Sequence, residues 1–99
     1  MYIKEAQKYV SNWCDKVFPE RTMAGTFVKF FSEIGEMTND PKDVHEYADV
    51  LVLLLDLAEQ NGVDIEEAFI EKMKINENRK WIKDPVLGIM NHVKENGCE

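Results

Sequence analysis

Apolar residues recur at steps of three and four along the first part of the chain, the spacing that places them on one side of an α-helix. The first run ends at Pro19, which cannot continue a helix, and its members are Ile3, Ala6, Tyr9, Val10, Trp13 and Val17. The second run follows Thr22, which we expect to cap its helix, and its members are Met23, Phe27, Phe30, Phe31, Ile34 and Met37. The pattern therefore predicts two amphipathic helices.

The third predicted helix is apolar on almost every side. We expect Asp40 to cap it, Pro41 to be its first residue and Gly62 to end it. Between positions 50 and 58 the apolar run is almost unbroken. A helix of this kind must be surrounded by other apolar surface, and a chain of 99 residues has few further helices to supply it. We therefore predict a homodimer or homotetramer, in which a second copy covers the remaining face.

Two further helices are predicted after the third. Asp64 and Glu67 form a near capping box, which starts a fourth helix that runs towards Trp81. A short last helix is expected from about position 86 to 96. Strand-like alternation is absent, and no stretch reads as a linker. The fold class predicted is all-α, a four- to five-helix bundle in a single domain of residues 1–99.

Charge and cysteine content narrow the function classes. The chain has 19 acidic against 12 basic residues, a net charge of −7, and no basic cluster. Such a surface repels nucleic-acid phosphates and anionic membranes, so neither is an expected partner. Cys14 and Cys98 are far apart and lack metal-ligand spacing, which argues against a disulfide scaffold and against a zinc site. No apolar run is long enough to span a bilayer, and we expect a cytoplasmic protein.

Two pairs of acids have the same helical spacing. Glu33 and Glu36 end the second helix, and Glu46 and Asp49 open the third. Residues three apart lie on one helix face, and a short turn near Asn39 makes the two helices an antiparallel hairpin. The four carboxylates are therefore expected to face one another beside apolar side chains, where their mutual repulsion calls for a cation.

Oxygen ligands favour Mg²⁺, Mn²⁺ or Ca²⁺, and an incomplete protein cage suits Mg²⁺, which keeps several waters and shares phosphate oxygens. A di-iron site is not expected, because no histidine follows a glutamate by three positions at these helices. The alternative is that both acid pairs are simply solvated. The chain would then be a non-catalytic helical module for oligomerisation. A third interpretation keeps the metal at the acids but not turnover, which would make the chain a nucleotide sensor.

The ordered set of motifs resembles the MazG-like all-α nucleoside triphosphate pyrophosphohydrolases. It consists of E-x-x-E, a short connection, E-x-x-D with its apolar run, and then K-x-x-x-N-x-x-R-x-W, formed by Lys72, Asn76, Arg79 and Trp81. The likeness covers about residues 1 to 81. Ser32 stands where the family often has a further acid, so the number of metal ions stays open.

The resemblance implies a Mg²⁺-dependent enzyme that cleaves a (d)NTP between its α- and β-phosphates, with Mn²⁺ as a possible substitute, in nucleotide-pool clean-up. The four acids would hold the metals, and one of them would act as general base. Lys72, Asn76 and Arg79 would reach phosphate or sugar oxygens.

Three other residues have two interpretations each. Lys29 either reaches a phosphate or forms an ion pair with Glu33, four positions later. Trp13 either stacks on the base of the nucleotide or packs in the core. Arg21 either borders the substrate entrance or caps a turn, and we favour the turn.

Overall fold

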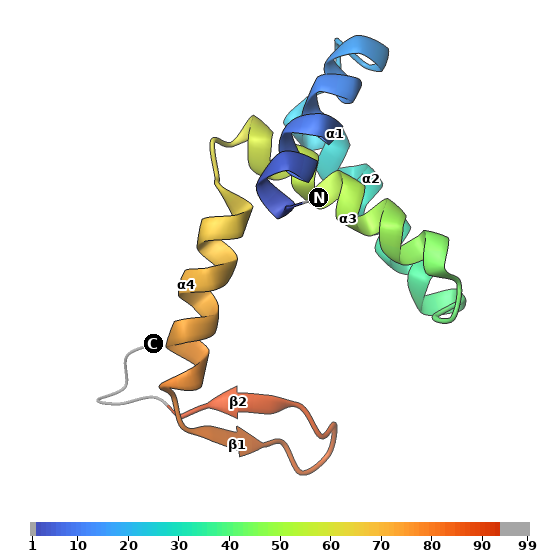
Figure 1. Cartoon of the computed structure of the whole chain (residues 1–99). Helices are drawn as coiled ribbons and strands as arrows, with labels where there is room; N and C mark the ends of the chain where they lie inside the picture. Colours follow the sequence, from blue (N-terminus) through green and yellow to red (C-terminus); the bar gives the residue numbers. More distant parts are fainter. Residues whose placement is uncertain (1, 94–99) are drawn as a thin grey trace. The chain divides into compact units, whose positions relative to one another are not determined.

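The computed structural model describes residues 2–93, and within them it has four helices and a two-stranded sheet (Figure 1). The elements are α1 (Ile3–Val17), α2 (Met23–Asn39), α3 (Val44–Gln60), α4 (Ile65–Glu77), β1 (Trp81–Lys83) and β2 (Met90–His92). The predominantly helical class is confirmed. The chain forms two compact units that divide after Ala68, inside α4, and the expectation of a single domain stays a prediction.

Most of the predicted helix ends are confirmed by their caps. The hydroxyl of Thr22 accepts a hydrogen bond from the N–H of Gly25 at 3.0 Å, and the carboxylate of Asp64 accepts one from the N–H of Glu67 at 3.1 Å. Gly62 lies just past the end of α3 with a φ of 68°, a conformation that glycine adopts without strain.

The predicted start of α3 is wrong by three residues. Asp43, not Asp40, is its N-cap, and the Asp43 carboxylate accepts a hydrogen bond from the N–H of His45 at 2.9 Å. Asp40 instead ends α2, with its N–H donating to the carbonyl of Glu36 at 3.2 Å. The chain has to reverse direction between the helices, and Pro41 and the residue after it form that turn.

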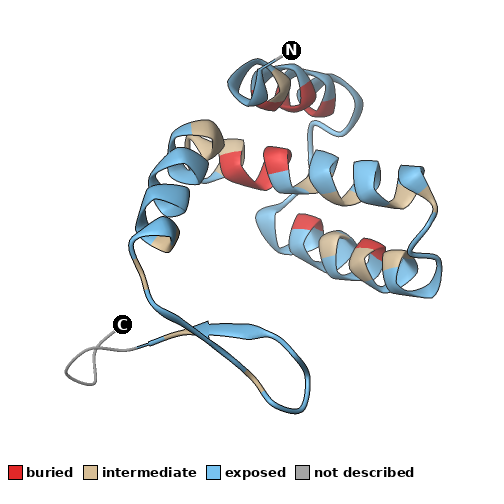
Figure 2. Cartoon of the chain, turned by 60° about the horizontal axis from the view of Figure 1, so that its bottom comes forward, coloured by how far each residue is buried: buried red, intermediate tan, exposed pale blue. Residues whose placement is uncertain are grey.

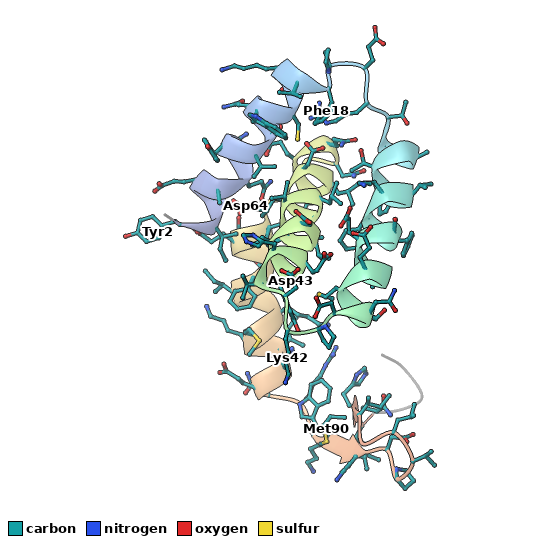
Figure 3. All side chains as sticks on the ribbon, turned by 90° about the vertical axis from the view of Figure 1, so that its right-hand side faces the viewer. Tyr2, Phe18, Lys42, Asp43, Asp64 and Met90 are labelled. Carbon is teal, nitrogen blue, oxygen red and sulfur yellow. The ribbon has the colours of Figure 1, made fainter. Side chains whose placement is uncertain are left out.

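The first unit is a helical hairpin with one helix packed against it. α2 and α3 lie side by side, and α1 packs against α3 (Figure 1). Buried segments of the three helices face one another (Figure 2). Val10 and Cys14 of α1 meet Leu55 of α3, with Ala6 and Ile65 partly buried against them. This core fixes the end of the hairpin that is remote from the α2–α3 turn; Figure 3 labels Asp43 at that turn and Phe18 where α1 meets α2.

A buried glutamine joins α1 to the connection between α3 and α4. Gln7 is 5% exposed, and its amide donates to the carbonyl of Val63 at 2.7 Å and to the carboxylate of Glu59 at 3.0 Å. Its carbonyl accepts from the N–H of Ile65 at 3.1 Å. Both ends of the side chain are thus satisfied, as burial of a polar group requires, and the α3–α4 turn is held to α1.

The predicted last helix is wrong over residues 86–93, where the chain forms a β-hairpin. β1 and β2 are antiparallel, with Trp81 opposite His92. The carboxylate of Asp84 accepts from the N–H groups of Val86 at 2.9 Å and Leu87 at 2.7 Å, so it closes a turn rather than capping a helix. The remainder of that predicted helix lies outside the described residues. The fourth helix also ends early, at Glu77.

Within residues 2–93, none of the helices combines the length and the hydropathy needed to cross a membrane.

Candidate metal centre

Three of the four predicted acids come together across the α2–α3 hairpin. Glu33 of α2 and Glu46 and Asp49 of α3 each offer a carboxylate oxygen, and these oxygens all lie within 4.8 Å of one another. The helix spacing explains the convergence, because Glu46 and Asp49 are three residues apart and share the face of α3 that meets α2. The hairpin predicted from the sequence therefore brings together three of the four acids expected there, without Glu36.

Two of these carboxylates are buried at one oxygen and have no hydrogen-bond donor there. Glu33 is 6% exposed, and Oε2 of Glu33 and Oε2 of Glu46 are buried without a partner among the described residues. A buried acceptor that lacks a donor costs free energy of folding, on the order of 1–3 kcal/mol and more when charged. Hard oxygen ligands of this kind fit a divalent cation such as Mg²⁺ or Mn²⁺.

Glu36 belongs to the same electrostatic group, although its side chain is exposed and it is not one of the three convergent acids. A hydrogen bond to Glu33, together with the negative charge of Glu33, raises the pKa of the Glu36 carboxyl. Burial first, and the charge of Glu36 second, raise the pKa of Glu46. The acids therefore repel one another in the absence of a cation.

Lys29 supplies a positive charge at this cluster. Its Nζ lies 3.0 Å from Oε1 of Glu33, one helical turn further along α2. This ion pair is the main cause that lowers the pKa of Glu33. Of the two interpretations of Lys29, the ion pair is the one the structure contains.

A cavity of about 380 Å³ opens beside the acids, between α1, α2 and α3. Trp13 lines it from α1 and is 49% exposed, so its ring is not buried in the core. The Trp13 ring meets Phe18 edge to face, with 5.6 Å between ring centroids. The surface of the cavity is mostly apolar, although Thr22 and Thr26 and the charged Arg21, Lys29 and Asp56 also line it.

Arg21 and Asp56 form a buried ion pair that the sequence interpretation missed. Arg21 does contact the turn, donating to the carbonyl of Phe18 at 3.3 Å, but its guanidinium also binds both carboxylate oxygens of Asp56 at 2.8 Å. One signal was present in the sequence. Asp56 is the charged residue within the apolar run of α3, and it lies seven positions, or two turns, after Asp49.

The basic motif lies in the second unit. Lys72 and Asn76 lie one turn apart on α4, whereas Arg79 lies beyond its end, so the three do not share one helix. Lys72 is exposed, and the side-chain oxygen of Asn76 is buried without a hydrogen-bond partner among residues 2–93. The indole N–H of Trp81 donates to the backbone carbonyl of Asn76 at 2.9 Å, which folds the end of the motif back on the helix. The binding roles of this motif stay predictions.

Comparison with known proteins finds related sequences in two phages. A protein of cyanophage S-2L named dATP/dGTP diphosphohydrolase is 39% identical over 93 residues, which are 92% of this chain and 88% of that protein. One of Salmonella phage PMBT28 with the same name is 44% identical over 80 residues, or 80% of this chain. The chain spans only 28% of the length of that second relative.

A solved structure has the same fold. It is the cyanophage S-2L MazG-like pyrophosphohydrolase bound to dGDP and three catalytic Mn²⁺ ions per active site, and it matches with a TM-score of 0.83 at 39% identity. The match covers 94% of this chain and 93% of that one. The sequence model of the dATP/dGTP pyrophosphohydrolases matches residues 6–99. The MazG-like resemblance is confirmed, and the chain belongs to the dATP/dGTP pyrophosphohydrolase family.

Proposed function

We propose that this chain is a Mg²⁺- or Mn²⁺-dependent pyrophosphohydrolase that converts dATP or dGTP to the deoxynucleoside monophosphate and pyrophosphate. The observation that supports it most is that Glu33 of α2 meets Glu46 and Asp49 of α3 across the hairpin, where Oε2 of Glu33 and Oε2 of Glu46 are buried without a hydrogen-bond partner among the described residues. A solvated acid pair would keep these oxygens at the surface, where water can reach them, whereas both are buried. The purine substrates follow from the names of the relatives.

The four acids have distinct surroundings in this proposal. Glu33, Glu36, Glu46 and Asp49 would hold the metal ions, which neutralise phosphate charge and lower the pKa of a bound water. Glu33 is buried, which restricts the orientation of its carboxylate, and in the protein without metal it pairs with Lys29. Asp49 and Glu36 are exposed and can meet a solvent-borne substrate. The general base is one of these four carboxylates.

The reaction balances with water as the only co-reactant. The water oxygen bonds to the α-phosphorus, and the bond from that phosphorus to the oxygen bridging the α- and β-phosphates breaks. Pyrophosphate leaves with the bridging oxygen and its electron pair. The proton that the water loses passes to a carboxylate of the acid group and then to solvent.

The cavity beside the acids is proposed to receive the base. Its lining combines the half-exposed Trp13 ring, which offers a stacking face, with apolar side chains that exclude water. Lys29 borders the cavity as well and is proposed to contact phosphate. Lys72, Asn76 and Arg79 are proposed to bind phosphate or sugar oxygens on the ground of their motif alone.

A second copy of the chain is proposed to cover apolar surface on the hairpin, as a homodimer or homotetramer. Leu51 of α3 is 52% exposed, and Val28 and Phe31 of α2 are 71% and 67% exposed. Burial of such side chains stabilises association. A helical oligomerisation module without turnover would use the same surface. The exposed apolar residues therefore do not distinguish the enzyme from that alternative.

Release of pyrophosphate across a panel of NTPs and dNTPs tests the function. With Mg²⁺ or Mn²⁺, the wild type should release pyrophosphate from dATP and dGTP in preference to the pyrimidine nucleotides. Asp49→Asn should lose activity by at least about a hundredfold, whereas Asp40→Asn, at the exposed end of α2, should not. Metal binding without any turnover would favour the sensor, and absence of both would favour the oligomerisation module.

A further inference from the structure

Lys29 lies at the boundary between the acids and the cavity. On one side its Nζ contacts Oε1 of Glu33 at 3.0 Å. On the other side the same residue lines the cavity that also contains Trp13. The Lys29 side chain is 62% exposed, whereas that of Glu33 is 8% exposed. The ammonium therefore lies on the solvent side of the ion pair and the carboxylate on its buried side.

The two cations that line the cavity differ in how firmly they are held. Arg21 is 16% exposed and binds Asp56 through two hydrogen bonds and Asp15 at 2.9 Å, so its guanidinium is fixed. Lys29 has one short contact, to Glu33, on a flexible four-carbon stem. An ammonium of this kind can exchange partners at little cost, which a fixed guanidinium cannot.

We propose that Lys29 is a resident counter-ion of the acid group, which gives up Glu33 when a divalent cation binds and then pairs with a phosphate oxygen of the nucleotide. This inference rests on the proposed function, because it assumes that the acids hold a metal and that a nucleotide binds beside them. It adds to that function by assigning two partners to Lys29. These are Glu33 in the free protein and a phosphate oxygen in the protein with metal and nucleotide bound.

The positive charge of Lys29 should affect the affinities for metal and for nucleotide in opposite directions. In the free protein Lys29 offsets part of the negative charge of Glu33, and it competes with any incoming cation for the same carboxylate. A metal ion at Oε2, the unpartnered oxygen of Glu33, would therefore share a carboxylate with the ammonium at Oε1 and repel it. Once a polyphosphate is present the released ammonium gains a new anion, so nucleotide and metal strengthen each other's binding.

The test measures Mn²⁺ binding by titration calorimetry, without nucleotide, for the wild type and Lys29→Met. Removal of the ammonium should tighten Mn²⁺ binding about two- to fivefold, the scale of an ion pair whose lysine is exposed. The matched control is Lys16→Met, an exposed lysine in the last turn of α1, and it should leave Mn²⁺ affinity unchanged. Lys29→Arg, which keeps the positive charge, should stay near the wild type.

A second titration uses a non-hydrolysable dGTP analogue at saturating Mn²⁺. Here Lys29→Met should bind about tenfold more weakly, because the phosphate loses a cation. Opposite changes in the two affinities are the signature of the exchange, since a variant that merely damages the fold weakens both. Thermal unfolding of each variant verifies that it is folded.

Equal or weaker Mn²⁺ affinity in Lys29→Met than in the wild type would overturn this inference while leaving the proposed function intact. Tighter Mn²⁺ binding with unchanged analogue affinity would overturn the second half of it, the transfer to phosphate. If the wild type binds no Mn²⁺, both the proposed function and the exchange are wrong.

Discussion

Arg21 holds Asp56 with one edge of its guanidinium through two hydrogen bonds, Nε to Oδ2 and Nη2 to Oδ1, each at 2.8 Å. Asp56 is 2% exposed and Gln60 adds a third hydrogen bond at 2.9 Å, so a carboxylate is satisfied inside an otherwise apolar stretch of α3. The hydrogen bond to Asp56 raises the pKa of Arg21, which stays charged. This pair ties the α1–α2 connection to α3 at one wall of the cavity.

Removal of one partner of this pair should destabilise the fold strongly. Arg21→Met leaves the buried Asp56 carboxylate without its cation, which costs about 3–5 kcal/mol in such pairs. The measurement is the free energy of unfolding by urea. The double variant Arg21→Met with Asp56→Leu should recover much of the loss, because no buried charge remains. A single variant within about 1 kcal/mol of the wild type would contradict this account.

Divalent cations should raise the thermal midpoint of the wild type, since a ligand that binds only the native state stabilises it by mass action. Glu46→Gln should abolish most of that gain, because Glu46 supplies one of the buried unpartnered oxygens. Without metal, the same variant should be at least as stable as the wild type, because a repelling charge has been removed. Differential scanning calorimetry with and without Mg²⁺ or Mn²⁺ measures the thermal midpoint of each variant and so tests both effects.

The matched control for this variant is Glu5→Gln, an exposed acid in the first turn of α1. It should keep the full stabilisation by metal. An equal loss in both variants would mean that the cation acts by screening the net charge of the chain and not through the cluster.

The acid cluster was predictable because it depends on two local regularities. Helical spacing sets the faces of Glu33 and Glu46, and a short turn sets the pairing of the two helices. An error of three residues in the start of α3 did not matter, since the faces within each helix are unchanged. What could not be read from spacing is which oxygens are buried, because that depends on the side chains packed around them.

The features that were missed depend on contacts between distant parts of the chain. Asp56 needs Arg21 from 35 positions earlier, and Gln7 contacts the segment after α3, more than 50 positions later. Rules based on helical spacing and capping relate residues only a few positions apart, so they do not identify such partners. The C-terminal hairpin was missed for a different reason, because Asp84 followed by proline is compatible both with a helix cap and with a turn, and the hairpin arises from pairing with Trp81–Lys83.

Stability should fall on acidification through a part of the fold that is remote from the acid cluster. Hydrogen bonds from Lys8 and Gln7 lower the pKa of Glu59, and the N–H of Glu67 lowers the pKa of Asp64. Some carboxyl groups have a lower pKa in the folded protein than in the unfolded chain. Such a group stabilises the fold at pH values above its pKa in the unfolded chain. That contribution is lost as the pH drops through the folded value, below about pH 5.

Glu59→Gln should therefore reduce the slope of unfolding free energy against pH in this acidic range, while retaining an acceptor for Gln7. The measurement is urea unfolding between pH 3 and 7, beside Glu71→Gln, an exposed acid of α4. A slope that is the same in both variants would show that Glu59 does not contribute.

The contacts of Gln7 predict a local and a global effect of its removal. Gln7→Ala leaves the carbonyl of Val63 and the N–H of Ile65 without the partners they have now. Buried groups that lose a hydrogen bond cost about 1–3 kcal/mol each. Because these two groups are only partly buried, we expect a loss near the lower end for the pair, about 2 kcal/mol in unfolding free energy. Glu5→Ala, an exposed position on the same helix, should cost far less.

Hydrogen exchange gives the sharper test of the Gln7→Ala variant. The amide of Ile65 should lose more protection than the amides within α2, because Gln7 Oε1 is its acceptor. Uniform loss of protection across the first unit would show that Gln7 acts through general packing instead of through this hydrogen bond.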